Sequence, residues 1–199
     1  MEKEAAVNRF ELLIIGGSAG SLEVVLEILP LLKEDMDYAI ILVMHRRSGD
    51  SLLTGLLSDK TKLKVKEAEE KEFIQPGIIY IAPADYHLLV EQDKTLSLDF
   101  SEKIHYSRPA IDASFETAAE AYKASLVGIL LSGANADGAE GLRQVKLAGG
   151  LTIVQDPDEA VVSYMPQQAI DNQAAERILN TRQIIELMNQ LNRTIRPGK

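Results

Sequence analysis

The sequence predicts an α/β fold with a doubly wound, mostly parallel sheet, helices on both faces and a small β-hairpin excursion. Three observations predict it. Short apolar runs recur along the chain, and continuous runs of this kind are typical of strands buried on both faces. Segments with the spacing of amphipathic helices separate these runs, and such alternation favours a parallel sheet. The middle of the chain instead shows several short strand-like stretches in succession.

Each expected element follows from its local pattern, in chain order. The first apolar run leads into a glycine-rich turn and then into a segment whose leucines and valines recur at helical spacing. The apolar runs predict strands over 12–15, 38–44, 126–131 and 151–154. The helical spacing predicts helices over 21–33, 50–57, 111–123, 138–148 and 181–192.

Residues 72–100 form the expected β-rich excursion. Its short strands are separated by the turn-forming residues Pro76-Gly77, Pro83 and Gln92-Asp93. We expect it to contain a hairpin that turns near Lys94-Thr95. The charge run over 67–72, just before these strands, is typical of a solvated loop.

Length, charge and cysteine content restrict the class of protein. A chain of 199 residues suits one domain, and we expect residues 1–199 to form it. The net charge of -9 disfavours nucleic acid and anionic membrane as general partners. Cysteine is absent, which excludes disulfides and thiolate metal sites. The chain shows neither a membrane-spanning apolar run nor a signal peptide at its start, so we expect a cytoplasmic protein without membrane insertion.

The turn Gly16-Gly17-Ser18-Ala19-Gly20 fits two chemistries, phosphate binding and nucleophilic attack. The dinucleotide fingerprint fails in both possible registers, and the lysine of a P-loop is missing. Arg46-Arg47 after the second strand could meet a 2′-phosphate, which keeps nucleotide binding as an alternative. The pattern G-x-S-x-G between strand and helix fits better, because it exposes a serine hydroxyl on a sharp turn. Ser18 is therefore a candidate nucleophile, with a simple helix N-cap as the competing interpretation.

A base and an orienting carboxylate follow two other predicted strands. His45 comes directly after the run 38–44, and Asp137 lies in the loop after 126–131. Because ligands bind at the carboxyl ends of the strands in such sheets, Ser18, His45 and Asp137 are expected to meet at one edge. This order along the chain differs from that of the α/β-hydrolases.

Other residues compete for these roles. Asp156, after the run 151–154, is the rival to Asp137 as orienting carboxylate. His87 and His105 lie in the β-rich excursion and at its exit, where a surface or structural role is expected. His45 could itself be a partly buried imidazole bonded to backbone, and Asp137 could be a helix N-cap.

Several stretches in the right order resemble the catalytic domain of the CheB family of chemotaxis protein-glutamate methylesterases. They are Ile15-Gly16-Gly17-Ser18-Ala19-Gly20, His45 after its strand, Ile81-Ala82-Pro83-Ala84-Asp85-Tyr86-His87, Arg108-Pro109-Ala110-Ile111-Asp112, Leu131-Ser132-Gly133-Ala134-Asn135-Ala136-Asp137-Gly138 and the late turn with Met165-Pro166. The resemblance covers about residues 10–190. It implies hydrolysis of methyl esters on receptor glutamates, and deamidation of receptor glutamines in some members.

Carried over residue by residue, the resemblance makes Ser18 the nucleophile, His45 the general base and Asp137 its orienting partner, with no metal or organic cofactor. The implied substrate is a methylated chemoreceptor or a similar signalling protein. Ala134 stands where the family usually has a methionine associated with the oxyanion site, and Ala136 where it usually has asparagine. Arg46-Arg47 replaces a common Met-Pro pair. The changes at Ala134 and Ala136 support a catalytically weak binding module in a signalling complex as the alternative.

Regulation is expected to differ from that of full-length family members, which carry a receiver domain before the catalytic domain. About ten residues precede the first expected strand in this sequence. We therefore expect a stand-alone form whose active site is accessible and whose control comes from localisation or from a separate regulatory protein.

Overall fold

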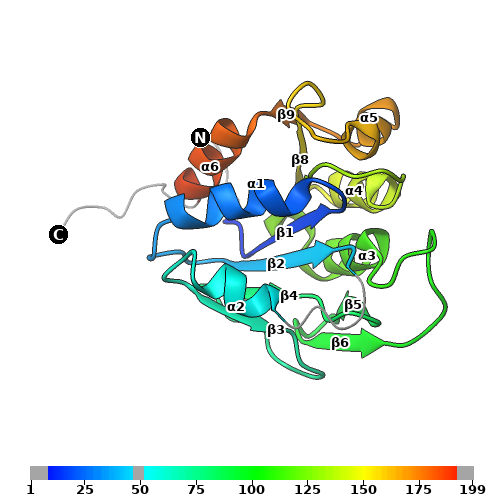
Figure 1. Ribbon diagram of the computed structural model, residues 1–199. Helices are drawn as coiled ribbons and strands as arrows, with labels where there is room; N and C mark the ends of the chain where they lie inside the picture. Colours follow the sequence, from blue (N-terminus) through cyan, green and yellow to red (C-terminus); the bar gives the residue numbers. More distant parts are fainter. Residues whose placement is uncertain (1–8, 47–51, 192–199) are drawn as a thin grey trace, which may run out of the picture.

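The computed structural model describes residues 9–46 and 52–191, which contain a seven-stranded sheet and a two-stranded hairpin (Figure 1). The strands of the large sheet are β1 (Leu12–Gly17), β2 (Ala39–Met44), β3 (Lys64–Glu67), β4 (Ile78–Ile81), β7 (Leu126–Leu130), β8 (Leu151–Gln155) and β9 (Arg177–Leu179). Their spatial order is β3-β4-β2-β1-β7-β8-β9, and all neighbouring pairs are parallel. The predicted doubly wound parallel sheet is confirmed.

Strand β1 lies in the middle of the sheet, where the strand order reverses. The chain passes from β1 to β2 on one side, and it later returns to β7 on the other. In register, Gly17 pairs with Met44 and Gly16 with Leu130, so the three strands end close together. Every residue of these three strands is buried, as their continuous apolar runs predict. A reversal of this kind is where open α/β sheets bind ligands.

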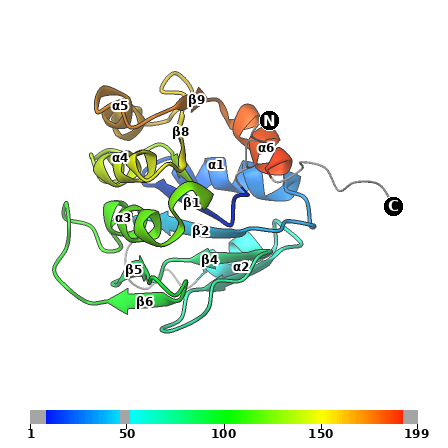
Figure 2. The same cartoon turned by 180° about the vertical axis from the view of Figure 1, so that it is seen from behind.

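Helices cover both faces of the sheet (Figures 1 and 2). Those on one face are α1 (Ser21–Ile28), α2 (Leu53–Ser58) and α6 (Thr181–Gln190), and those on the other are α3 (Ile111–Tyr122), α4 (Ala139–Leu147) and α5 (Tyr164–Asp171). Alternate residues of β1 point into the two hydrophobic cores. Leu13 packs in the core under α1, α2 and α6, and Leu12 packs in the core under α3, α4 and α5. Short 3-10 turns at Leu29–Leu31 and Lys123–Ser125 follow α1 and α3.

The β-rich excursion is partly as predicted. Strands β5 (His87–Val90) and β6 (Leu96–Asp99) form the expected antiparallel hairpin, with Lys94 at positive φ in its turn. Strand β4, however, belongs to the main sheet and pairs with β2. The edge strands β3 and β9 and the helix α5 were not predicted. Both strands are short and partly exposed, so they lack the continuous apolar run that marks the central strands.

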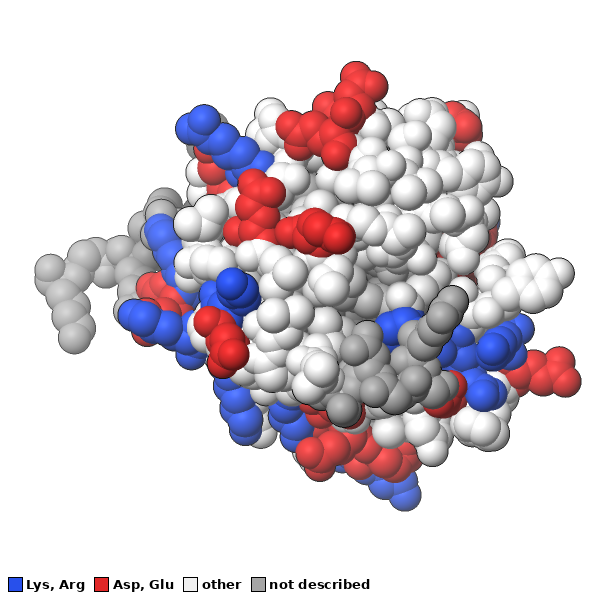
Figure 3. Space-filling model, viewed as in Figure 1, with Lys and Arg blue, Asp and Glu red and all other residues white. Residues whose placement is uncertain are grey.

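The surface carries both signs of charge. On the face shown in Figure 3, acidic side chains lie at the top, in the middle and along the bottom, and Lys and Arg side chains lie at the left, along the bottom and at the right edge. Opposite charges also pair directly, as in Lys66 with Glu69 and Glu72. The net acidity of the sequence therefore does not make this face uniformly negative. In the described ranges, no helix combines the length and apolarity that crossing a membrane would require.

Candidate active site

Ser18 stands on a tight turn between β1 and α1. Its N–H donates to the carbonyl of Ser132 (2.9 Å), and its own carbonyl accepts from the N–H and the hydroxyl of Ser21 (3.0 and 2.6 Å). Gly20 completes the turn with φ 82°. Within residues 9–46 and 52–191, the Ser18 hydroxyl has no hydrogen-bond partner, although its backbone is fixed on both sides. The turn thus presents a partly exposed hydroxyl without using it as a helix cap.

Gly20→Ala is expected to destabilise the protein and to disturb the turn that presents Ser18. Left-handed backbone costs a non-glycine residue about 1–2 kcal/mol. A Cβ there would also lie 2.5 Å from the Cβ of Val161 and 2.9 Å from the hydroxyl of Ser132. That hydroxyl donates to the carbonyl of Ala19 (2.7 Å), so the clash would disturb the turn that carries Ser18.

Denaturant unfolding measures this loss, and Gly55→Ala in α2 is the matched control. No atom lies within 4 Å of a Cβ built on Gly55. Removing a helical glycine there is expected to leave stability unchanged or to raise it by up to about 1 kcal/mol. Equal stability of the two variants would contradict this account of the turn.

His45 follows β2 and lies beside the turn of Ser18. Its N–H donates to the carbonyl of Gly17 (3.1 Å), which continues the pairing of β1 with β2 by one residue. Its ring nitrogen Nε2 lies 2.7 Å from Oδ2 of Asp137, and only 12% of its side chain is exposed. Because an ionised carboxylate can only accept, this contact places a proton on Nε2 and leaves Nδ1 as the free base nitrogen.

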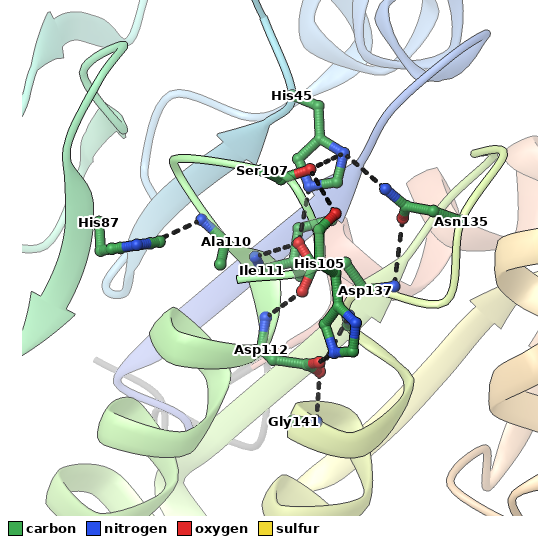
Figure 4. Close-up of polar contacts among 11 residues, drawn as sticks. His45, His87, His105, Ser107, Ala110, Ile111, Asp112, Asn135, Asp137 and Gly141 are labelled. Atoms are coloured by element: carbon green, nitrogen blue, oxygen red, sulfur yellow. Dashed lines mark hydrogen bonds and ion pairs between the residues drawn. The ribbon is translucent and has the colours of Figure 1, made fainter. Parts of the chain in front are cut away.

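Asp137 is a fully buried carboxylate that receives several N–H groups (Figure 4). Oδ2 accepts from the N–H of Ile111 (2.7 Å) as well as from His45, and Oδ1 accepts from the N–H of Asp112 (2.9 Å). These two amides begin α3, so Asp137 caps that helix from another part of the chain. Burial alone would raise the pKa of Asp137, but the hydrogen bonds from His45 and from the two amides outweigh it and hold the pKa below its ordinary value.

Asp112, in the first turn of α3, accepts hydrogen bonds from the start of the neighbouring helix α4. Its Oδ1 accepts from the N–H groups of Gly138 and Gly141 (2.9 and 2.7 Å), which begin α4 just after Asp137. Asp137 therefore caps α3, which contains Asp112, and Asp112 caps α4, which follows Asp137. Burial, together with the charge of Asp137, raises the pKa of Asp112 to about 6 despite these hydrogen bonds. Its Oδ2 lies 3.4 Å from Nε2 of His105, which is half-exposed.

Asp112→Asn is expected to stabilise the protein more at about pH 8 than at about pH 5. The pKa of Asp112 rises on folding from 3.8 to about 6. Its stabilising contribution is therefore complete below about pH 4 and is lost as the pH rises through about 6. The amide keeps an oxygen for Gly138 and Gly141 but buries no charge, so the gain at the higher pH is on the order of 1 kcal/mol.

Thermal unfolding of variant and wild type across this range measures the difference. The range stays above about pH 5 because the lowered pKa of Asp137 acts in the opposite sense, giving stability that is lost as the pH falls through that pKa. A difference in Tm that does not change with pH would contradict the raised pKa.

The three residues singled out in the sequence lie at the same edge of the sheet. His45 and Asp137 are in direct contact, whereas Ser18 is beside His45 through the paired ends of β1 and β2. Among the described residues, no hydrogen bond joins the Ser18 hydroxyl to the imidazole. Asp156, the rival carboxylate, instead accepts from the N–H of Asp158 in the loop after β8.

The other two histidines take different places. His87 is almost fully buried and structural, since Nδ1 accepts from the N–H of Ala110 (3.1 Å) and Nε2 lies 2.9 Å from the carbonyl of Glu102. His105 is half-exposed and lies against Asp112. Neither contacts Asp137 in the part of the chain that the structure describes, and no group of three His, Asp or Glu side chains there could hold a metal ion.

Arg46 occupies a structural position beside the site. Its guanidinium pairs with Glu67 at the end of β3 and donates to the carbonyl of Ala82 (3.2 Å). These contacts hold it against β3 and the end of β4, where its side chain is almost fully buried. Arg47, the second residue of the predicted pair, lies outside the described residues.

Sequence reasoning missed two side chains beside His45. The hydroxyl of Ser107 lies 3.3 Å from Nδ1 of the imidazole, and Nδ2 of Asn135 lies 3.5 Å from the same nitrogen. Ser107 comes from the long loop before α3, where no local pattern marked it. Asn135 lies two residues before Asp137, so its place in that loop was the only available signal.

Comparisons with known proteins find similar sequences and a similar solved structure. The family model for the CheB methylesterase matches residues 13–188. A Leptospira interrogans protein, provisionally named protein-glutamate methylesterase/protein-glutamine glutaminase, is 43% identical over 92% of this chain and 95% of its own length. A Thermotoga maritima protein named protein-glutamate methylesterase/protein-glutamine glutaminase is 35% identical, and the chain spans about half of it (54%). The crystal structure of the Thermotoga maritima CheB methylesterase catalytic domain is similar with a TM-score of 0.86 and 34% identity, over 92% of this chain and 98% of that one.

Proposed function

The chain belongs to the CheB methylesterase family, and from this premise we propose that it hydrolyses methyl esters of glutamate side chains in chemoreceptor-type proteins. The observation that carries the proposal is the 2.7 Å contact between His45 and the buried Asp137, beside the exposed turn of Ser18. The names of the relatives extend the proposal to glutamine deamidation. Both reactions pass through the same acyl group on an activated serine.

We propose that Ser18 is the nucleophile and His45 the general base. Nδ1 of His45 takes the proton of the Ser18 hydroxyl as its oxygen bonds to the ester carbonyl carbon. The C–OCH3 bond then breaks, and the proton passes from Nδ1 to the departing oxygen, which leaves as methanol. Water attacks the acyl carbon with the same help, and the Ser18 oxygen departs with a proton.

Asp137 would stabilise the imidazolium that forms in each step. Its carboxylate faces Nε2 and is ionised, because its hydrogen bonds hold its pKa below the ordinary value. It does not need to take the proton. Because Ile111 and Asp112 donate to the same carboxylate, its position is fixed before substrate binds.

Backbone N–H groups beside Ser18 support the developing oxyanion in this proposal. The amide of Ala19 follows the nucleophile, and the amide of Ala134 lies in the loop that contacts it. In the described ranges neither amide has a hydrogen-bond partner. A Cβ built on Gly133 would lie 3.1 Å from Cβ of Ser18, so the loop approaches the nucleophile closely. A backbone amide does not require the methionine side chain that Ala134 replaces.

Methanol release from a methylated chemoreceptor tests the proposal. Wild type is expected to release methanol from the methylated receptor and none from the unmethylated receptor. Labelling by a fluorophosphonate at Ser18 would show an activated nucleophile independently of the receptor chosen. The alternative, a binding module of weak catalytic power, is favoured by the missing hydrogen bond between Ser18 and His45. That alternative predicts receptor binding with neither labelling nor methanol release.

A further inference from the structure

The free nitrogen of His45 is contacted from two separate segments. Ser107, in the loop between β6 and α3, places its hydroxyl 3.3 Å from Nδ1, and Asn135, in the loop between β7 and α4, places Nδ2 3.5 Å from it. Figure 4 shows the two side chains approaching the ring from different sides. Together with Asp137 at Nε2, they surround the imidazole with polar groups at both nitrogens.

The orientation of the Asn135 amide is fixed by its own loop. The N–H of Asp137 donates to Oδ1 of Asn135 (3.1 Å), so the NH2 group is the part that faces His45. An amide NH2 can only donate, which requires Nδ1 to be an acceptor. This agrees with the proton placed on Nε2 by Asp137, and the two contacts select the same tautomer.

Ser107 is held by a tight turn of the long loop. Its N–H and carbonyl both bond to the backbone of Ile104 (2.8 and 3.1 Å), and the two residues between them, His105 and Tyr106, have positive φ. The backbone of Ser107, from which the hydroxyl reaches the ring, is therefore held in place. A hydroxyl can donate to the neutral Nδ1 and accept from the same nitrogen after it is protonated, whereas Asn135 serves only the neutral ring.

We propose that Ser107 and Asn135 are positioning residues that aim the base nitrogen Nδ1 of His45 at the reacting hydroxyl. The inference rests on the proposed function, because it assumes that His45 is the base for Ser18. Nδ1 has a single lone pair, so the Ser18 hydroxyl has to displace these two long contacts when it donates to the ring, which they hold in place until then. Losing both leaves Asp137 as the only hydrogen-bond partner among the described residues that fixes the angle of the ring.

Steady-state kinetics of Ser107→Ala, Asn135→Ala and the double variant test the role. We expect kcat to fall about three- to tenfold in each single variant and at least about tenfold in the double variant, with KM nearly unchanged. Ser107→Thr keeps a hydroxyl and is expected to recover most of the activity lost in Ser107→Ala. The matched control is Ser101→Ala in the same loop, whose hydroxyl donates to Asp99 (2.6 Å) and is not part of the site.

Nitrogen-15 NMR of the histidine rings separates positioning from a merely structural role. In wild type, His45 is expected as the Nε2–H tautomer, and its Nδ1 resonance should shift to higher frequency in each alanine variant as a donor is lost. His87, fixed at both nitrogens by backbone, is the internal reference and should not move. Unchanged kcat in the double variant, or an unmoved Nδ1 resonance, would overturn the inference.

The two readouts also separate this inference from the proposed function. An inactive wild type whose Nδ1 resonance responds to both substitutions would count against the esterase and leave the donor pair standing as a feature of the site. An active esterase whose His45 Nδ1 resonance does not respond would contradict the role of Ser107 and Asn135 and leave the proposed function standing.

Discussion

Ser18→Ala is expected to abolish methyl ester hydrolysis while the fold stays intact. The variant loses the only atom that can form the acyl intermediate in the proposed mechanism, and removal of a triad member costs on the order of 10³-fold or more in kcat. The Ser18 hydroxyl has no hydrogen-bond partner in the described ranges, so its loss leaves no buried group unsatisfied. Methanol release from methylated receptor measures the effect.

Stability and labelling provide the controls for this variant. Its Tm should equal that of wild type within the error of the measurement, because the backbone bonds of the turn to Ser21 and Ser132 are unchanged. Fluorophosphonate should label wild type and not the variant. Full turnover in Ser18→Ala would remove Ser18 from the mechanism, whichever other serine then carried the reaction.

Asp137→Asn is expected to reduce kcat on the order of 10⁴-fold, the cost of holding the base in the wrong tautomer. With the NH2 group in place of Oδ1, the amide would face the N–H of Asp112 and would leave no negative charge beside the imidazolium. With the NH2 group in place of Oδ2, it would face the N–H of Ile111 and would require Nε2 of His45 to accept. The ring proton would then sit on Nδ1, where the base needs a free electron pair. The same amide leaves a donor at the start of α3 unsatisfied, so Tm should fall as well.

Asp156→Asn is the matched control, since it changes another loop aspartate that follows a central strand. Its carboxylate accepts only from the N–H of Asp158 among the described residues, and an asparagine oxygen can do the same. Activity is expected to stay close to wild type. If Asp156→Asn proved the more damaging change, the orienting role would belong to Asp156 and the contact seen at His45 would not be the catalytic one.

The central sheet could be predicted from sequence because its strands are buried on both faces. The runs at β1, β2 and β7 are continuous and apolar, and β8 departs from this pattern only at Thr152 and Gln155, so their sequences favour buried strands over helices. The edge strand β3 alternates lysines with other residues and is partly exposed, so the same signal is absent. Strand β4 was recognised as a strand, but its partner in the sheet depends on pairing across the chain, which local pattern does not contain.

The placement of Ser18, His45 and Asp137 at one edge of the sheet could be predicted because each directly follows a buried strand or lies in the loop after one. Parallel strands bring the positions after their carboxyl ends to one edge of the sheet, whatever conformation the loops adopt. Ser107 had no such guide, since its place against His45 depends on how a long loop folds back. The role of Asp112 as a cap for α4 likewise depends on the packing of two helices, and the sequence showed only that it begins one of them.

The exchange of caps between Asp112 and Asp137 couples local unfolding of the two helix starts to the loss of the contact between Asp137 and His45. When the first turn of α3 opens, Asp112 moves and the N–H groups of Gly138 and Gly141 lose their acceptor. When the loop before α4 opens, Asp137 withdraws from Ile111 and from His45 together. Neither helix start can fray without loosening the other, so the two open as one cooperative unit. The position of the Asp137 carboxylate therefore depends on the contact between α3 and α4 as well as on its own loop.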